Sequence, residues 1–276
     1  MVLAAPTVLP HVPPARRGLA SGAIFTGVGL GIMASGTVVP LLLQAGLVMT
    51  WGGLGLLSLL LTALAWGGWP AEDARAAPPP GTARRAAVGG ALLALYVAYA
   101  LNATGLVPHM VFLVDFVARG LGQGIHAGAR YWVLFGLGAV AGPVLAGLLA
   151  DRVGFGPALR LALLIQAAAV ALPIVTAHAV GLAVSSLVVG AAVPGIVPLV
   201  LGRVHELVPD DPEGQRAAWS VTTMAFALGQ AAGAYGLSFL FARGDHYATL
   251  FAVGVAALTL ALVIDVAARV AGRRAI

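Results

Sequence analysis

Residues 16–36 read RRGLASGAIFTGVGLGIMASG, and residues 216–236 read RAAWSVTTMAFALGQAAGAYG. Each stretch begins with arginine and continues as a long apolar run. Each also follows a Pro-x-x-x-Pro pair, in AAPTVLP at 4–10 and in AVPGIVP at 192–198. The matched positions are Gly29 with Gly229, Ala34 with Ala234 and Gly36 with Gly236. The chain therefore carries a parallel repeat with a period of about 200 residues, and it begins inside that repeat.

The composition places these runs in a membrane. The chain of 276 residues is 60% hydrophobic and only 9% charged, and its mean hydropathy is +0.98. A soluble domain of this size needs far more polar surface than these residues supply. The net charge of +5 comes from arginines near the ends of apolar runs. We interpret them as topology signals and predict no nucleic-acid partner. The absence of cysteine excludes disulfides and thiolate metal sites.

Eight apolar stretches are each long enough to cross a bilayer as a helix, so we predict an all-α polytopic membrane protein. The segment PAEDARAAPPPGTARR at 70–85 contains three consecutive prolines and five charges, which is typical of a linker between two bundles. The predicted spans are 18–43, 47–68, 87–113, 131–150, 157–176, 179–201, 217–241 and 247–268. The predicted parts are the remainder of an N-terminal bundle (1–69), the linker (70–86), a C-terminal six-helix bundle (87–268) and a tail (269–276).

The arginines predict which side of the membrane each loop occupies. If the first full span starts in the cytoplasm, 12 of the 15 arginines lie on the cytoplasmic side. Only Arg119, Arg130 and Arg243 lie outside. This distribution follows the positive-inside rule, so we expect the linker and the C-terminus in the cytoplasm and the chain in the cell (inner or plasma) membrane.

The segment GLLADRVG at 147–154 resembles the loop signature G-x-x-x-D-R-x-G of the major facilitator superfamily. The matching residues are Gly147, Asp151, Arg152 and Gly154. The basic residues that usually follow are absent, and Arg160 is their nearest substitute. In their amino-acid sequence, residues 16–36 together with GLVPHMVFLVDFVARGLG at 105–122 resemble the YbfB/YjiJ family of bacterial transporters.

The resemblance implies a secondary transporter in which two bundles rock about a site near the midplane of the membrane. It implies a small-molecule substrate, no cofactor, and a monomer embedded in the lipid bilayer. Residues 1–10 then correspond to the end of helix 4, so we expect three further spans upstream of Met1. A genuine short form is the alternative, and an in-frame stop codon directly upstream would support it.

Helix 7, the predicted span at 87–113, carries the clearest polar stripe. Tyr99, Asn102 and His109 lie within about 80° on an ideal helix. Polar groups at membrane depth are costly unless they face protein or water, so this stripe predicts a substrate pathway, with His109 able to exchange a proton. The alternatives are bonds between helices, or a position of His109 near the outer headgroups. Asp115 is a second candidate for proton coupling, although an ion pair with Arg119 at the outer interface is also compatible with its position.

Other candidates lie on later helices. Pro194 and Pro198 predict a kink that serves either as a gate or as structure alone. Thr223 and Gln230 are candidate ligand contacts on the predicted span 217–241, and bonding between helices is the alternative. We expect Gln166 to form such a bond and Asp265 to lie at the surface beside Arg269. On the predicted span 18–43, Gly27 and Gly31 form a flat stripe for close helix packing.

The sequence shows no recognisable catalytic pattern. The segment HELVP at 205–209 is not the HExxH zinc motif. No Ser, His and Asp residues lie in the sequence context of a known catalytic triad. We therefore predict no enzymatic activity. The alternative to a transporter is a membrane-embedded protein without transport activity, either an enzyme or an assembly partner.

Overall fold

The computed structural model describes residues 17–67, 89–209, 211–244 and 246–274. Within this part every regular element is helical, and eight helices are long and apolar enough to cross a membrane. The predicted all-α fold is therefore confirmed. The predicted half-helix at 1–10 and the linker at 70–86 lie outside the described residues.

The observed helices extend several of the predicted spans. The helix predicted at 87–113 begins at Gly90 and continues to Gly120, and the helix predicted at 131–150 already begins at Ile125. The bounds are α2 (Arg17–Gln44), α3 (Leu47–Trp66), α4 (Gly90–Val107), α6 (Ile125–Val153), α7 (Phe155–Val175), α8 (Ala179–Leu207), α9 (Pro212–Gly244) and α10 (Tyr247–Arg274). Three short segments continue α4, namely η3 (Pro108–Phe112), α5 (Leu113–Asp115) and η4 (Phe116–Gly120).

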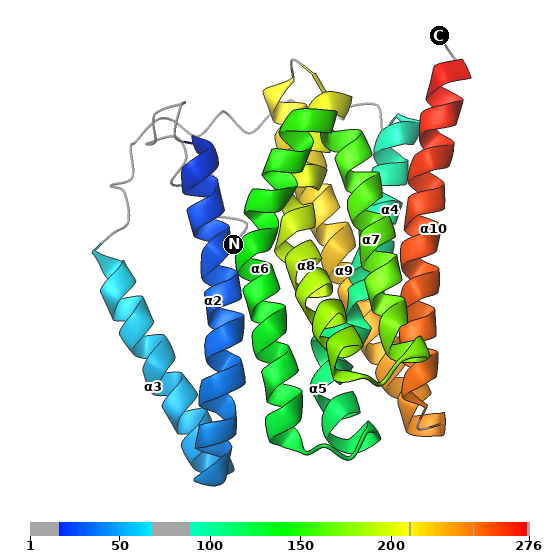
Figure 1. Ribbon diagram of the computed structural model, residues 1–276. Helices are drawn as coiled ribbons and strands as arrows, with labels where there is room; N and C mark the ends of the chain where they lie inside the picture. The colour runs from blue at the N-terminus through cyan, green and yellow to red at the C-terminus, as the bar shows by residue number, and fades with distance from the viewer. Residues whose placement is uncertain (1–16, 68–88, 210, 245, 275–276) are drawn as a thin grey trace.

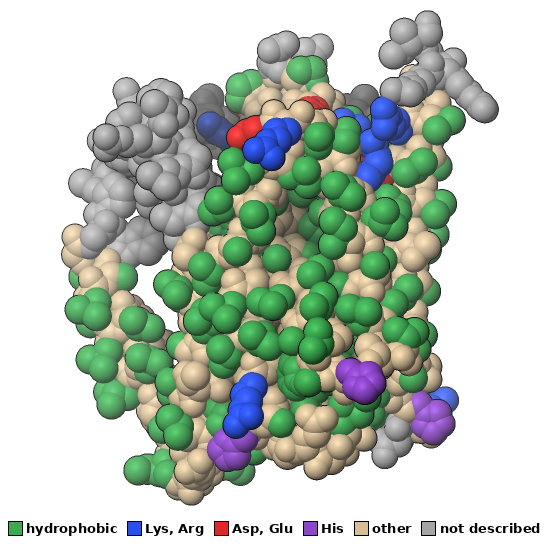
Figure 2. Space-filling model, viewed as in Figure 1, with side chains coloured by type: hydrophobic (Ala, Val, Ile, Leu, Met, Phe, Trp, Pro, Cys, Tyr) green, Lys and Arg blue, Asp and Glu red, His purple; other side chains and the backbone are tan. Residues whose placement is uncertain are grey.

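The helices after the linker form one bundle, and the two before it lie along one side (Figure 1). Within the bundle, α6 packs on α8, α4 packs on α9 and α10, and α7 packs on α8 and α10. Of the two helices before the linker, α2 packs against α6, while α3 contacts α2 at the margin. Apolar side chains cover the middle of the surface, and most charged side chains gather at its two ends (Figure 2). This is the pattern expected of a protein surrounded by lipid.

Glycines set the distance between α6 and α8. A side chain on Gly138 would place its Cβ 2.0 Å from the carbonyl oxygen of Leu187, and one on Gly142 would meet the carbonyl oxygen of Ala191 at 2.0 Å. From the other helix, a Cβ on Gly190 would lie 2.0 Å from the carbonyl oxygen of Phe135. The two backbones are therefore in direct contact, as small residues permit in membrane helices.

The contact between α2 and α6 also depends on glycine. A Cβ on Gly29 would lie 2.4 Å from the backbone nitrogen of Val140, and one on Gly36 would lie 2.9 Å from Val133 Cγ2. The indole Nε1 of Trp132 donates a hydrogen bond to Ser35 Oγ at 3.0 Å. The predicted stripe was therefore placed on the wrong positions. Gly27 and Gly31 meet no described neighbour within 4 Å, because the face that packs on α6 carries Gly29 and Gly36.

The matched glycines of the repeat have different neighbours. Gly29 and Gly36 of α2 pack on α6, whereas Gly229 of α9 packs on the backbone of Ala100 in α4. No described atom lies within 4 Å of a Cβ built on Gly236. Within the described part of the chain, the glycines matched by the sequence repeat therefore do not make equivalent contacts.

Candidate functional site

Helix 7, the first helix after the linker, consists of α4, η3, α5 and η4 and is a different element from α7. It changes its winding just past its middle. The regular α-helix α4 ends at Val107, and two five-residue π-helical segments follow, η3 and η4, separated by the three residues of α5. Pro108 begins the first π segment and has no N–H to donate to the preceding turn. Because π turns occur in many helices at functional sites, the C-terminal half of helix 7 is a candidate functional region.

The predicted stripe of helix 7 is buried, but its members face three different helices. The ring of Tyr99 packs on Phe226 of α9, with centroids 4.7 Å apart. Asn102 Nδ2 donates to Gln166 Oε1 of α7 at 2.7 Å. His109 is bonded to α8 through Ser185. The wide turn that begins at Pro108 changes the direction of His109 alone, since Tyr99 and Asn102 lie in the regular helix α4 and meet different helices because several helices surround α4. The bond predicted for Gln166 is confirmed.

The hydrogen bonds around His109 determine its tautomer. Ser185 Oγ donates to the carbonyl oxygen of Ala169 at 2.6 Å, so its only proton is committed. The 2.7 Å contact between His109 Nε2 and Ser185 Oγ therefore requires Nε2 to carry the donated hydrogen. His109 is fully buried, and its Nδ1 has no hydrogen-bond partner among the described residues. The edge of Phe251 lies against the same ring. His109 thus has one nitrogen fixed between helices and one unsatisfied acceptor.

Asp115 lies in a polar cluster at the end of helix 7. Its carboxylate accepts a hydrogen bond from Arg119 Nε, as predicted, and another at 2.6 Å from the hydroxyl of Tyr247 on α10. The sequence analysis missed Tyr247. An aromatic residue at the start of a membrane helix was the available signal, but the 132 residues between the two partners hide the contact.

The candidates on α8 and α9 lie within continuous helices. Helix α8 runs through both Pro194 and Pro198, and the first of these is buried. Thr223 Oγ1 donates to the carbonyl oxygen of Trp219 in its own helix. Gln230 reaches helix 7, where its Nε2 lies 3.5 Å from Met110 Sδ. Tyr99 and Gln230 therefore both lie at the interface between helix 7 and α9.

The loop signature lies at the turn between α6 and α7. Gly154 has φ +83°, a left-handed conformation that favours glycine, and it separates the two helices. Asp151 and Arg152 are exposed, and a Cβ on Gly147 would meet nothing within 4 Å. Among the four signature residues, Gly154 is therefore the one whose backbone conformation forms the turn between α6 and α7.

The prediction that Asp265 lies at the surface was wrong. Its residue exposure is 6%, and its Oδ2 accepts a hydrogen bond at 2.6 Å from Arg160 Nε of α7. Helix α10 packs along α7, so the carboxylate faces a guanidinium 105 residues away in sequence rather than the headgroups. Arg160, considered above only as part of the loop signature, thus links two helices.

Eight apolar helices with buried hydrogen bonds and with most of their charges at the ends define a polytopic α-helical membrane protein. Residues 1–266 match the model of a family described as "Uncharacterised MFS-type transporter YbfB". The chain therefore belongs to this family of the major facilitator superfamily, and it is a membrane transporter of a small molecule. This confirms the family resemblance found in the sequence. No curated protein matches the chain.

Proposed function

We propose that the protein is a secondary active transporter in which the helices before and after the linker rock against each other. The main support is the contact between α2 and α6, which joins helices from opposite sides of the linker through Gly29 and Gly36. Glycine leaves a smooth surface, so packed helices can shift at these positions without separating interdigitated large side chains. The proposal includes a monomer in the plasma membrane, with the linker and C-terminus in the cytoplasm, as the arginine distribution favours.

A crosslink across this contact is expected to stop transport. The double variant Gly36→Cys/Val133→Cys places two Cβ atoms within about 4.5 Å, because a Cβ on Gly36 would lie 2.9 Å from Val133 Cγ2. The protein, expressed from its complete reading frame, is reconstituted in proteoliposomes and screened by counterflow with radiolabelled sugars, amino acids, amines and carboxylates. For the solute that exchanges, oxidation should lower the rate at least about tenfold, and a reductant should restore it.

The control crosslink lies within one side of the linker. In Thr176→Cys/Gly181→Cys the two Cβ atoms lie about 3.7 Å apart, with Thr176 directly after α7 and Gly181 in the first turn of α8. Because residues 1–276 contain no cysteine, a disulfide between two of these residues is an introduced one. The control should crosslink without loss of transport. If the pair between α2 and α6 crosslinks completely while exchange continues, rocking at this contact is ruled out.

The substrate pathway proposed from the sequence runs along Tyr99, Asn102, His109, Pro194, Pro198, Thr223 and Gln230. Among these, Tyr99 and Gln230 have the stronger support, because within the described residues Tyr99 meets α9 by ring packing and Gln230 meets helix 7 by a weak 3.5 Å contact with the Met110 sulfur, so no short hydrogen bond to another helix occupies their polar groups. Asn102 and His109 are each bonded to another helix, which favours the alternative of bonds between helices. For proton coupling, the described contacts favour neither candidate, because His109 is fully buried away from solvent and the Asp115 carboxylate is held by Arg119 and Tyr247.

Asn102→Ala and His109→Ala should separate these roles. Each removes one bond between helices, so each should lower the free energy of unfolding by about 0.6 kcal/mol and at most by about 1.7 kcal/mol. After correction for folded protein, Asn102→Ala should retain its transport rate. If His109 couples transport to protons, His109→Ala should in addition abolish the pH dependence of transport near neutral pH.

The control for this comparison is His178→Ala. His178 is exposed at the start of α8, so its substitution should leave both stability and the pH profile unchanged. An unaltered pH profile in His109→Ala would exclude a proton role for that residue. A loss of transport in Asn102→Ala that exceeds the loss of folded protein would instead place Asn102 in the pathway.

A further inference from the structure

Four residues form one stripe along α9, and none of them is charged. They recur in alternate steps of four and three residues, which places them on one face of the helix. All four are partly buried. The members of this α9 stripe are Trp219, Thr223, Phe226 and Gln230. The stripe therefore combines two aromatic rings with a hydroxyl and an amide.

Side chains of helix 7 lie against two members of the α9 stripe. The ring of Tyr99 packs on Phe226, with centroids 4.7 Å apart. The sulfur of Met110 lies 3.5 Å from Nε2 of Gln230. Because a thioether sulfur is only a weak acceptor, this contact leaves most of the hydrogen-bonding capacity of the amide to a ligand. The two helices thus surround the Gln230 amide with rings and a sulfur.

The bundle brings no charge to the stripe at membrane depth. Asp, Glu, Lys and Arg are absent from the middle of each helix after the linker, over residues 90–114, 131–150, 161–202, 217–242 and 247–264. A charged ligand on the stripe would lose its water without gaining an opposite charge from this bundle, which is costly within a membrane. The stripe therefore favours an uncharged ligand.

The polar groups of the stripe are too few for a sugar, which has a hydroxyl on most of its carbons. Thr223 Oγ1 already donates to the carbonyl oxygen of Trp219, so the Gln230 amide is the main polar group of the stripe. An amide can donate and accept at once. The neighbouring rings and the Met110 sulfur form favourable contacts with another aromatic ring. This combination matches a ring that bears one polar, uncharged substituent.

We propose that the α9 stripe, together with Tyr99 and Met110 of helix 7, binds an uncharged aromatic solute. The ring of the solute lies against Phe226, and its polar substituent lies on the Gln230 amide, about one helical turn away. Uncharged aromatic compounds are then the substrate class of the transporter, so the inference rests on the proposed pathway along Tyr99 and Gln230. Affinity for a single-ring compound is modest, because few contacts are made.

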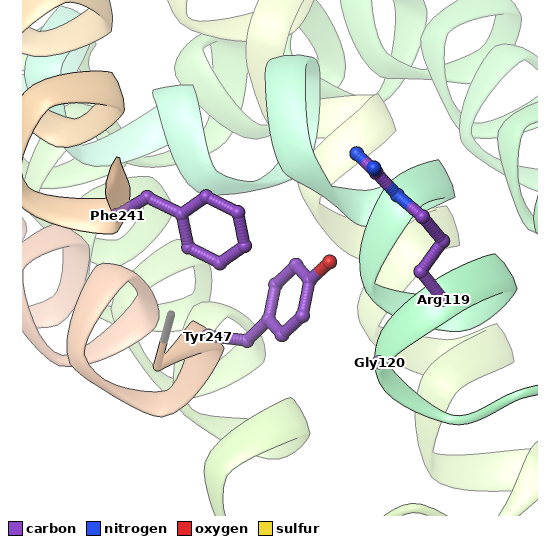
Figure 3. A pocket seen from close by; sticks show the side chains of 4 residues that line it. All are labelled: Arg119, Gly120, Phe241 and Tyr247. Carbon is purple, nitrogen blue, oxygen red and sulfur yellow. The ribbon is translucent and has the colours of Figure 1, made fainter. Parts of the chain in front are cut away.

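A cavity with aromatic walls at the end of helix 7 is the rival location. It has a volume of about 310 Å³ and is lined by Arg119, Gly120, Phe241 and Tyr247 (Figure 3). Arg119 and the Tyr247 hydroxyl both donate to the Asp115 carboxylate. A ring that entered this cavity would displace water from that ion pair, which costs free energy. The α9 stripe is therefore favoured, and Phe241 provides a control on the same helix.

The test uses benzamide as the probe, with the protein expressed from its complete reading frame in lipid nanodiscs and with empty nanodiscs subtracted. Benzoate and benzamidine have the same ring and nearly the same shape, but at neutral pH one is an anion and the other a cation. In equilibrium dialysis, benzamide should bind at least about tenfold more tightly than either. Acetamide, which has the amide without the ring, should bind at least about tenfold more weakly than benzamide. Binding of benzoate or benzamidine as tight as that of benzamide would overturn the proposal.

Matched variants assign the binding to the stripe. Phe226→Leu removes the ring contact and Gln230→Leu removes the amide, so each should weaken benzamide binding by about fivefold. Phe241→Leu removes a ring from the rival cavity, and Tyr235→Leu removes a ring of α9 that is 81% exposed. Each control should change binding less than twofold. If Phe226→Leu is too unstable to purify, Gln230→Leu decides alone, because its described contact with helix 7 is weak.

Two results with these variants would contradict the proposal. Benzamide binding could persist unchanged in Gln230→Leu, or it could fall in Phe241→Leu as far as in the stripe variants, which would place the ligand in the rival cavity. Dialysis is done without any gradient, so a failure of the crosslinking prediction would leave the binding result unaffected. Conversely, a protein that exchanges another solute but does not bind benzamide would overturn only this inference.

Discussion

Asp265→Ala is expected to lower the free energy of unfolding by roughly 3 kcal/mol, the lower end of the range for breaking one half of a buried ion pair. The side chains of Arg160 and Asp265 are only 13% and 7% exposed. Removal of the carboxylate leaves a buried guanidinium without its partner between α7 and α10. Thermal unfolding of the purified protein and its abundance in the membrane both measure the effect.

Two further variants show whether burial is the cause. Glu206→Ala breaks the more exposed pair between Arg203 and Glu206 within α8, and it should cost about 1 kcal/mol or less. The double variant Arg160→Met/Asp265→Leu removes both charges and should recover most of the lost stability, because apolar replacements of a buried pair are often neutral. If the double variant is as unstable as Asp265→Ala, the cause is packing rather than the unpaired charge.

The membrane spans could be predicted because the bilayer itself sets their length. A run of about 20 apolar residues has few alternatives to a membrane helix, whatever its neighbours are. The prediction failed where neighbours decide the outcome. Helix 7 was expected to end at residue 113, before the charged Asp115, yet it continues to Gly120. The contacts of Asp115 with Arg119 and Tyr247 neutralise the charge that seemed to end the helix.

The side-chain partners were less predictable than the helices. Periodicity indicated that Tyr99, Asn102 and His109 share a buried face, but it could not indicate which helix each one meets. Ser185 was missed because a serine in an apolar run gives no sign of its partner, and the adjacent residue is also a serine, Ser186. Ser186 bonds within its own helix to Leu182, while Ser185 reaches His109. One residue on a helix changes the face by about 100°, so only packing decides between them.

The same substitution at two positions of α6 should have opposite effects. Gly142→Ala is expected to destabilise the protein by about 3 kcal/mol, the upper end of the usual cost of overpacking, and to reduce its abundance sharply. The new Cβ would lie 2.0 Å from the carbonyl oxygen of Ala191, so α8 must move away by more than about 1 Å along a contact that also includes Gly138 and Gly190.

Gly147→Ala is the matched control, since it lies on the same helix about one and a half turns later. A Cβ there would meet nothing within 4 Å, and alanine favours a helix over glycine by up to about 1 kcal/mol. The expected result is therefore unchanged or slightly raised thermal stability, although Gly147 belongs to the loop signature. Equal losses at Gly142 and Gly147 would show that general features of α6, rather than its backbone contact with α8, control stability. A loss of transport in stable Gly147→Ala would instead give that signature glycine a role in the transport cycle.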